Sequence, residues 1–253
     1  MLIKLDSSTS NQPSHNFTVN FTNLELETNA TYEIGLVRAS VWYSFHNISS
    51  EFNNNTLEYS HNGGTNWNTI TFSNGIYSVD AINQYVQAKL LQNNHYNTVN
   101  GINTYDITIA PNYTTLKVDI ILTNNFQVRF NSNIKDLLGF DSNQVTITSS
   151  SSGNNPANIT RSVNSLHIHC SIATGSYENA STSDLIYSFV PQVSPGSLMD
   201  VFPNHILYLP INTSNQIQSI RMNITDQLNR EVNLQNEATT YLLHLRKKQT
   251  RPI

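Results

Sequence analysis

The sequence is poor in cysteine and in charge. It contains one cysteine among 253 residues, so no internal disulfide can form and the fold must depend on its apolar core. Charged residues make up 12% of the chain, about half the usual share. The 13 basic and 17 acidic residues give a formal net charge of −4, which argues against a dedicated nucleic-acid-binding protein, because such proteins carry a strongly basic surface.

The chain also lacks long apolar runs and the common catalytic motifs. Met1–Asp6 does not contain the apolar region of a signal peptide, and no segment is long enough to span a membrane. We therefore expect synthesis without a secretory signal and no membrane partner. Phosphate-binding loops, G-x-S-x-G, H-E-x-x-H and calcium loops are absent. These absences predict a protein that is not an enzyme and has no cofactor.

Two histidines are the best candidates for chemistry. His167 and His169 lie two residues apart in an alternating run, so on a strand both imidazoles project to the same face. They could supply half of a metal site, but no third ligand on that face is identifiable from sequence. Cys170 points to the opposite face, which excludes a Cys–His nucleophile pair. We predict two histidines on a polar face, a buried thiol, and no catalytic or metal site.

Alternating apolar residues predict an all-β fold. In Ser165–Ile172 apolar and polar residues alternate with the period of a half-buried strand. The runs Leu185–Val190 and Ile206–Ile211 are apolar at nearly every position, which predicts central strands covered on both faces. Between residues 163 and 246 no helix is long enough for a parallel crossover, so we expect antiparallel sheets. Further strands are predicted at Leu2–Leu5, Phe17–Phe21, Tyr32–Phe45, Leu57–Ser60, Trp67–Phe72, Tyr105–Ala110, Thr115–Leu122, Phe126–Phe130, Ile217–Thr225 and Tyr241–Leu245.

One segment changes period. An apolar stripe with helical spacing, preceded by Ser78 or Asp80 as a possible cap, predicts one amphipathic helix at about residues 79–92. We expect this helix to pack against the open end or the flank of the sandwich. The stripe consists of Ile82, Tyr85, Val86, Lys89 and Leu90.

The most loop-like stretch is 148–156, which is rich in Ser and Asn. It is either a linker between an N-terminal part, 1–147, and the C-terminal strands, 157–246, or an exposed loop within one domain. The C-terminal part is marginal as an independent unit, so we expect one domain, 1–253, with a shared core.

The C-terminus concentrates positive charge. Four of the 13 basic residues lie within six positions, next to or within an expected basic tail, 247–253. This is enough for weak contact with phosphates, although a solvated chain end is the simpler interpretation. The candidate DNA contacts are Arg246, Lys247, Lys248 and Arg251.

Several short motifs follow one another in order over most of the chain. They are Phe17-Thr18-Val19-Asn20-Phe21, Tyr32-Glu33-Ile34-Gly35-Leu36-Val37, Trp42-Tyr43-Ser44, Gly75-Ile76-Tyr77, Leu137-Leu138-Gly139-Phe140, Leu166-His167-Ile168-His169-Cys170, Tyr208-Leu209-Pro210, Ile224-Thr225-Asp226 and Leu243-His244-Leu245-Arg246. In this order they resemble capsid proteins of Polinton (Maverick) elements and of adintoviruses, of the penton or minor capsid type.

The resemblance implies a jelly-roll capsid protein of a eukaryotic double-stranded DNA virus or virus-derived transposon. Major capsid proteins of that group are generally longer double jelly rolls, whereas the vertex protein is a single jelly roll with an insertion. The length of 253 residues favours the vertex protein. Because we expect more than eight strands, the predicted fold is a jelly-roll β-sandwich with an inserted subdomain and one amphipathic helix. Two compact jelly rolls in tandem are the alternative.

The resemblance also implies the partners and the location. The chain would assemble with itself, as a homopentamer in preference to a homotrimer, and with other capsid proteins in the virion. The basic tail would face the packaged DNA. A surface rich in Asn, Ser and Thr agrees with this role, because a low charge reduces repulsion between identical neighbours.

Three other functions are weighed against the vertex protein. The first is a trimeric major capsid protein. The second is a lectin-like sandwich in which Trp42, Tyr43 or Trp67 stacks on sugar, although such aromatics more often serve core or subunit contacts. The third is a hydrolase on a jelly-roll scaffold, which the absence of a polar cluster in the sequence disfavours.

Overall fold

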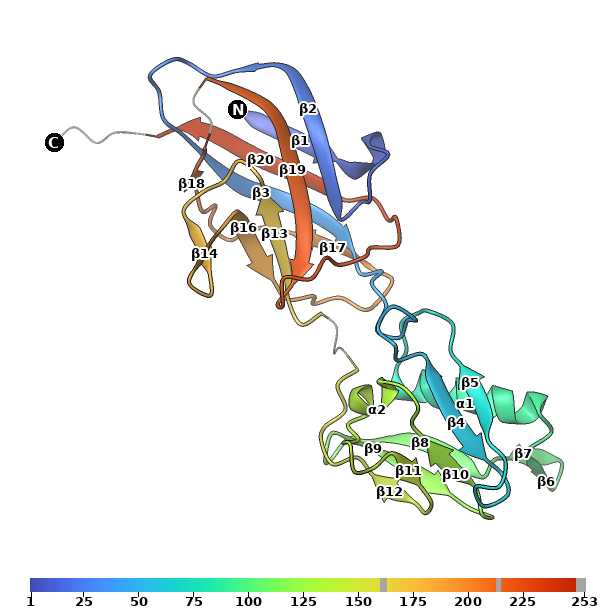
Figure 1. Ribbon diagram of the computed structural model, residues 1–253. Coiled ribbons are helices and arrows are strands. Elements are labelled where there is room, and N and C mark those ends of the chain that lie inside the picture. The colour runs from blue at the N-terminus through green and yellow to red at the C-terminus, as the bar shows by residue number, and fades with distance from the viewer. Residues whose placement is uncertain (160–162, 213–214, 249–253) are drawn as a thin grey trace. The chain divides into compact units, whose positions relative to one another are not determined.

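The computed structural model describes residues 1–159, 163–212 and 215–248, and the chain forms two compact units (Figure 1). Unit 1 comprises Met1–Phe45 and Ser162–Ile253, and unit 2 comprises His46–Arg161. Each unit has a hydrophobic cluster of its own. The chain therefore leaves unit 1 once and returns to it, so unit 2 is the expected inserted subdomain. We expected one shared core, with 148–156 as a linker or a loop. The structure instead has two clusters, and the chain passes between the units at 45/46 and 161/162.

Unit 1 is built from two antiparallel sheets. The strand orders are β1-β20-β3-β17 and β16-β13-β19-β2, with a short strand, β18, paired to β3 beside β17. The strands are β1 (Leu2–Asp6), β2 (Asn16–Glu25), β3 (Tyr32–Trp42), β13 (Leu166–Cys170), β16 (Leu185–Phe189), β17 (Leu198–Val201), β18 (Leu209–Pro210), β19 (Gln216–Asp226) and β20 (Thr240–Lys247). A short hairpin, β14 (Ser176–Glu178) with β15 (Ser181–Ser183), lies between β13 and β16 in the chain.

The pairing of the eight main strands is nested. Counted along the chain, the first pairs with the eighth (β1 with β20) and the second with the seventh (β2 with β19). The third pairs with the sixth (β3 with β17) and the fourth with the fifth (β13 with β16). This is one long antiparallel hairpin rolled into two sheets, which is the topology of a jelly roll. The predicted fold is confirmed, and the alternative of two tandem jelly rolls is wrong, because unit 2 has a different sheet arrangement.

Alternation along the strands explains how the sandwich packs. In β20 the side chains of Tyr241, Leu243 and Leu245 are buried, while their neighbours face outward. The predicted strand at Ser165–Ile172 is confirmed as β13. The prediction of two central strands is wrong, because β16 is an edge strand and the second run forms only the two-residue β18. An apolar run thus fixes neither the place of a strand in its sheet nor the burial of its side chains, since Val190 is 59% and Leu207 65% exposed.

Over its described residues, 46–159, unit 2 has three small sheets and two helices. The sheet orders are β11-β10-β4-β5, β12-β9-β8 and β6-β7. The elements are β4 (Thr56–Ser60), β5 (Asn68–Thr71), α1 (Val79–Gln92), β6 (Asn97–Val99), β7 (Ile102–Thr104), β8 (Ile107–Asn112), β9 (Lys117–Leu122), β10 (Gln127–Arg129), α2 (Ile134–Leu137), β11 (Thr146–Ile147) and β12 (Ser151–Ser152). Asn62-Gly63-Gly64 can supply the positive φ values that a tight turn needs, which predicts a hairpin of Leu57–Ser60 with Trp67–Phe72. The pairing of β4 with β5 confirms it.

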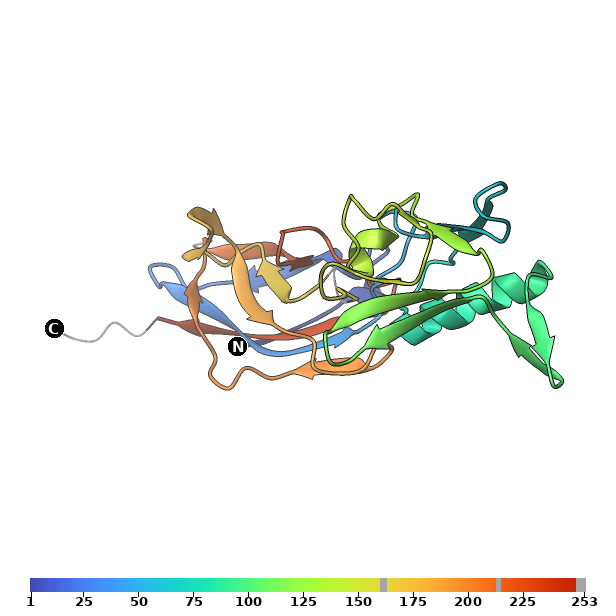
Figure 2. The same cartoon turned by 90° about the horizontal axis from the view of Figure 1, so that it is seen from below.

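Helix α1 has the predicted bounds but a different partner. Ser78 caps it, accepting a hydrogen bond from the Ala81 N–H at 3.1 Å, and its apolar stripe is buried. The helix packs within unit 2, where the Asn83 side chain accepts a hydrogen bond from Ile109 N–H of β8 at 2.8 Å. Figure 2 shows α1 beside the hairpin of β8 and β9. The expected packing against the sandwich is wrong, since the inserted unit supplies its own apolar surface.

The stretch 148–156 belongs to unit 2. Strand β12 pairs with β9, and the Asn155 N–H donates to Gly139 O at 2.9 Å. Gly139 follows α2 with a φ of +83°, and a Cβ there would lie 2.2 Å from Asn155 O. Glycine thus ends the helix and lets this stretch pack against it. A Ser/Asn-rich composition indicates a loop but does not distinguish a linker from a packed loop.

Separate cores predict separable stability. Ile224 of unit 1 and Ile109 of unit 2 are both fully or almost fully buried. Replacing either by alanine is expected to cost about 2–5 kcal/mol of the free energy of unfolding, because each change leaves a cavity. Measured by amide hydrogen exchange, Ile224→Ala should destabilise unit 1 alone and Ile109→Ala unit 2 alone. Faster exchange across both units in either variant would contradict this.

Candidate functional site

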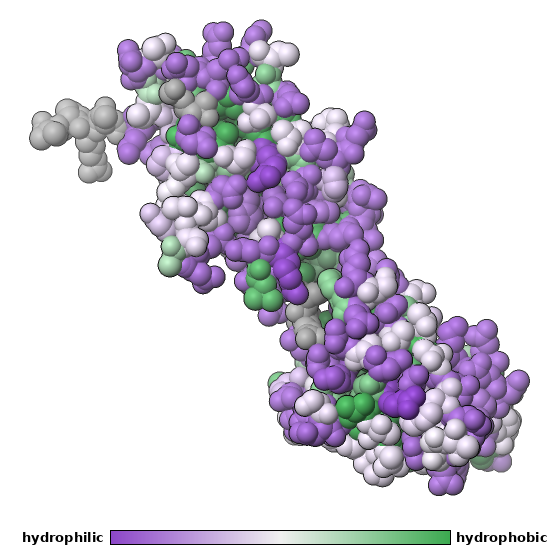
Figure 3. All heavy atoms as spheres, in the orientation of Figure 1, coloured by the Kyte–Doolittle hydropathy of each residue, from purple (hydrophilic) through white to green (hydrophobic). Residues whose placement is uncertain are grey.

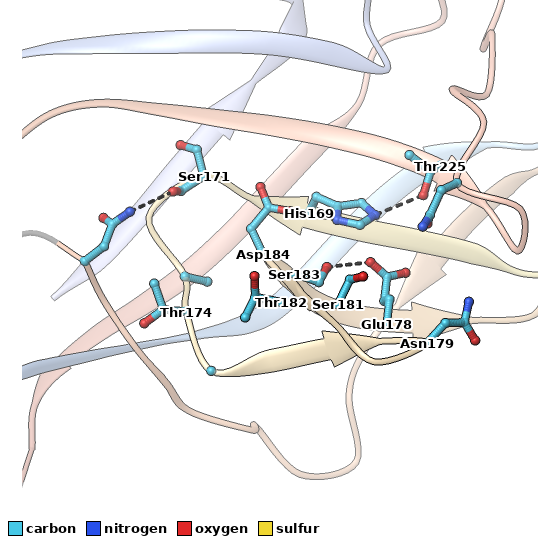
Figure 4. Close-up of a pocket in the computed structure, with 14 residues that line it drawn as sticks. His169, Ser171, Thr174, Glu178, Asn179, Ser181, Thr182, Ser183, Asp184 and Thr225 are labelled. Carbon is cyan, nitrogen blue, oxygen red and sulfur yellow. Dashed lines mark hydrogen bonds and ion pairs between the residues drawn. The ribbon is translucent and has the colours of Figure 1, made fainter.

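A polar pocket of about 790 Å³ opens beside β13 in unit 1 (Figure 4). The β14–β15 hairpin, the end of β13 and Thr225 of β19 all contribute to its lining. Among the described residues that line it are two carboxylates and no lysine or arginine. The lining residues are His169, Ser171, Ala173, Thr174, Gly175, Glu178, Asn179, Ser181, Thr182, Ser183, Asp184, Asn212, Thr225 and Asn229.

The two predicted histidines each contact a carboxylate. His167 Nδ1 lies 3.0 Å from Glu178 Oε1, and His169 Nδ1 lies 2.9 Å from Asp184 Oδ1. The other ring nitrogen of His169 lies 2.9 Å from the hydroxyl oxygen of Thr225. We expected both histidines on the polar, solvent-facing side of the strand. His169 is instead buried, at 8% exposed, and has partners on both ring nitrogens.

The carboxyl groups of Glu178 and Asp184 are both held in the ionised form. Burial opposes ionisation of Glu178, but hydrogen bonds from Ser183 and His167 outweigh it and hold the pKa of this carboxyl below its ordinary value. The hydrogen bond with His169 lowers the pKa of Asp184 against the opposing effect of burial. The pocket therefore carries negative charge at neutral pH.

Sequence reasoning missed Glu178 and Asp184. Each lies in a short polar segment, and neither fits the period-2 pattern that located the histidines. A signal that could have found Glu178 is Gly175, whose positive φ lies in the turn between β13 and β14 that brings Glu178 back beside His167.

A second hollow, the β16–β17 groove, lies in unit 1 between two edge strands. Its volume is about 710 Å³, and its lining includes Tyr187 and Phe189 of β16 and Met199 and Val201 of β17. Val190 and Phe202, which follow the two strands, are each 59% exposed. Edge strands leave backbone hydrogen-bonding groups unpaired, so this side of the sandwich is suited to contact with another chain.

The face of the molecule in Figure 3 is mostly hydrophilic, with small separate apolar areas. Two of the aromatics considered for sugar stacking have other partners. Tyr43 stacks on Phe45 with ring centroids 4.4 Å apart, and the Arg129 guanidinium lies 4.1 Å from the centroid of Trp67. These contacts occupy ring faces that a sugar would need.

The basic residues near the C-terminus do not share one environment. Arg246 and Lys247 belong to β20, where Arg246 pairs with Glu33 at 3.0 Å and Lys247 forms an ion pair with Glu27. The guanidinium of Arg246 also lies over the ring of Tyr208. The backbone N–H of Lys248 donates to the carbonyl of Thr31.

Arg251 lies outside the described residues. Because β20 extends to Lys247, the expected tail of 247–253 begins inside a strand, and its contact with DNA stays a prediction.

No helix in the described part of the chain is both long and apolar enough to cross a membrane.

Cys170 is expected to be chemically inert in the folded protein. Its side chain is fully buried on the core side of β13, and burial raises the pKa of the thiol to about 12. At pH 8 we expect no reaction with a thiol reagent such as DTNB until denaturant is added, and then one thiol per chain. Rapid labelling of the native protein would contradict the assigned burial.

Comparisons with known proteins address the fold. No protein-family model matches the sequence, and no curated protein matches it. Among solved structures, that of the selenomethionine-labelled mavirus penton protein is similar with a TM-score of 0.52 and 10% sequence identity, over 98% of this chain and 100% of that chain. A chain from the cryo-electron microscopy structure of the Sputnik virophage is similar with a TM-score of 0.46 and 12% identity, over 96% and 97% of the two chains.

At such low identity the similarity concerns the fold. It covers nearly the whole chain, so unit 2 as well as the sandwich falls within the compared length. The chain therefore has an all-β, jelly-roll fold with an insertion, like that of the mavirus penton protein.

Proposed function

We propose that this chain is a structural capsid protein that assembles with copies of itself at the vertices of an icosahedral virion. The observation that carries the proposal is the similarity to the mavirus penton protein over 98% of this chain and 100% of that chain, at only 10% sequence identity. A vertex has fivefold symmetry, so the assembly is a homopentamer in contact with other capsid proteins. The role is structural and requires no catalytic group. A trimeric facet protein and a lectin-like module are the competing functions.

The β16–β17 groove is the surface that we assign to contact between copies. It combines two unpaired strand edges with exposed apolar side chains, and Arg38, paired with Asp200 at 2.7 Å, lies 5.2 Å from the centroid of Phe202. An apolar patch with a polar rim is typical of subunit interfaces. The low overall charge adds little repulsion between neighbouring copies.

Mass photometry and negative-stain imaging of the purified chain test the proposal. We expect fivefold rings. Phe202→Asp should raise the dissociation constant of the assembly at least about tenfold, because an unpaired carboxylate buried in an interface costs several kcal/mol. Leu228→Asp is the matched control, since Leu228 belongs to the same unit and is similarly exposed, at 66%, but lies outside the groove. It should leave the rings unchanged.

Each competing outcome has a distinct signature. A protein that stays monomeric at all concentrations contradicts self-assembly. Threefold particles favour the facet protein, and monomers that bind on a glycan array favour the lectin-like module. Equal effects of Phe202→Asp and Leu228→Asp would remove the groove from the interface.

The predicted DNA contact is proposed for Lys248 and Arg251 ahead of Arg246 and Lys247, whose charges are already paired with carboxylates. Lys248→Ala should weaken binding to duplex DNA and lower the slope of log affinity against log salt by about 0.9. The neighbouring Lys247→Ala should change both much less. Two results would contradict the assignment. One is no DNA binding at about 50 mM salt, where contacts with phosphates are strong; the other is an equal effect of the two variants.

A further inference from the structure

Three metal-ligating side chains converge where β13 meets the β14–β15 hairpin. His167 and His169 project from β13, and Glu178 ends β14. One ligand atom from each of the three lies within 4.8 Å of the other two. His167 Nδ1 and Glu178 Oε1 are already 3.0 Å apart. Two ligands of a tetrahedral zinc ion, each at about 2.0–2.1 Å from the metal, lie roughly 3.3 Å apart, so this pair already has nearly the spacing that zinc requires.

The cluster is largely screened from water and includes a carboxylate, with a second one beside it. The side chains of His167, His169 and Glu178 are 18%, 10% and 13% exposed. Glu178 and Asp184 bring two negative charges. The described residues that line the pocket include no lysine or arginine, and the nearby charge of Arg221 on β19 acts on Asp184. A largely buried carboxylate such as that of Glu178 requires hydrogen-bond donors or an opposite charge nearby, and a bound cation would supply the charge.

Neighbouring groups orient the three side chains as supporting residues do at metal sites. Asp184 Oδ1 accepts from His169 Nδ1, which leaves Nε2 as the nitrogen that carries a lone pair. The Thr225 hydroxyl lies 2.9 Å from this nitrogen and would give up its hydrogen bond when a metal binds there. Ser183 donates to Glu178 Oε2, the oxygen that does not contact His167. Hydrogen bonds of this kind fix the tautomer of a histidine and the direction of a carboxylate.

We propose that His167, His169 and Glu178 bind a divalent metal ion, with Asp184 as the residue that positions His169. Two imidazoles and one carboxylate match the ligand preferences of zinc, and a water molecule would complete four ligands. The site differs from the groove assigned to subunit contact and does not depend on the capsid role. A bound metal would fix the position of the β14–β15 hairpin against β13. This hairpin is otherwise partly exposed, with Tyr177 at 69%.

Zinc titration of the full chain tests the proposal. Protein freed of metal with EDTA is titrated with zinc chloride in a calorimeter, and we expect saturable binding of one ion per chain. Amide exchange in residues 176–183 should slow when zinc is added. Cobalt(II) in place of zinc should give the visible absorption bands of a four-coordinate site with nitrogen and oxygen ligands.

Substitutions locate the site. Glu178→Gln and His167→Gln should each weaken zinc binding by more than about tenfold, and Asp184→Asn by about 10–100-fold. His205→Gln is the control, because His205 is an exposed histidine outside the cluster. This variant should bind zinc with the affinity of the unmodified protein.

Two results would overturn the proposal: no saturable zinc binding by the unmodified chain, or unchanged affinity in Glu178→Gln. The first measurement requires no substitution, so the test stands even where a variant does not fold. The two histidine–carboxylate contacts would then be ordinary hydrogen bonds of the folded protein. A monomeric chain that binds zinc would contradict the capsid role and support the metal site, so failure of one proposal can be told from failure of the other.

Discussion

The nested antiparallel pairing of unit 1 is the constraint on which the rest of the structure depends. Every strand before the insertion pairs with a strand after it, and in the outermost pair Leu2 lies opposite His244. Such long-range pairs form only after a large loss of chain entropy. Burial of alternate side chains offsets that loss, as in β20, and a slip of one residue would turn Tyr241, Leu243 and Leu245 toward solvent. The register and the core therefore stabilise each other.

The same nesting explains why an entire unit can be inserted between β3 and β13. That connection joins the third strand to the fourth and need not run through either sheet. The entropic cost of a longer connection grows only with the logarithm of its length. Unit 2 offsets its own ordering with a separate core in which α1 covers β8. The sandwich therefore keeps its eight-strand topology.

Local patterns in the sequence predicted local structure well. The bounds of α1, the β4–β5 hairpin and β13 follow from periodicity and turn residues, which act over a few positions. The existence of two cores could not be predicted, because the pattern of apolar residues in a strand shows which side chains are buried but not which other strands they pack against. For the candidate site, His167 and His169 were located by their spacing. Glu178 and Asp184 enter it only through the fold of the hairpin.

The separation of unit 1 in the sequence also shapes how the protein emerges during synthesis. Unit 2 is continuous in sequence, so all of its pairing partners have left the ribosome once residue 161 has done so. Strands β1, β2 and β3 are made earlier but have no main partner until β17, β19 and β20 follow. For that interval the nascent chain presents three unpaired strands beside an already folded unit, which is the stage at which a chaperone would have most to protect.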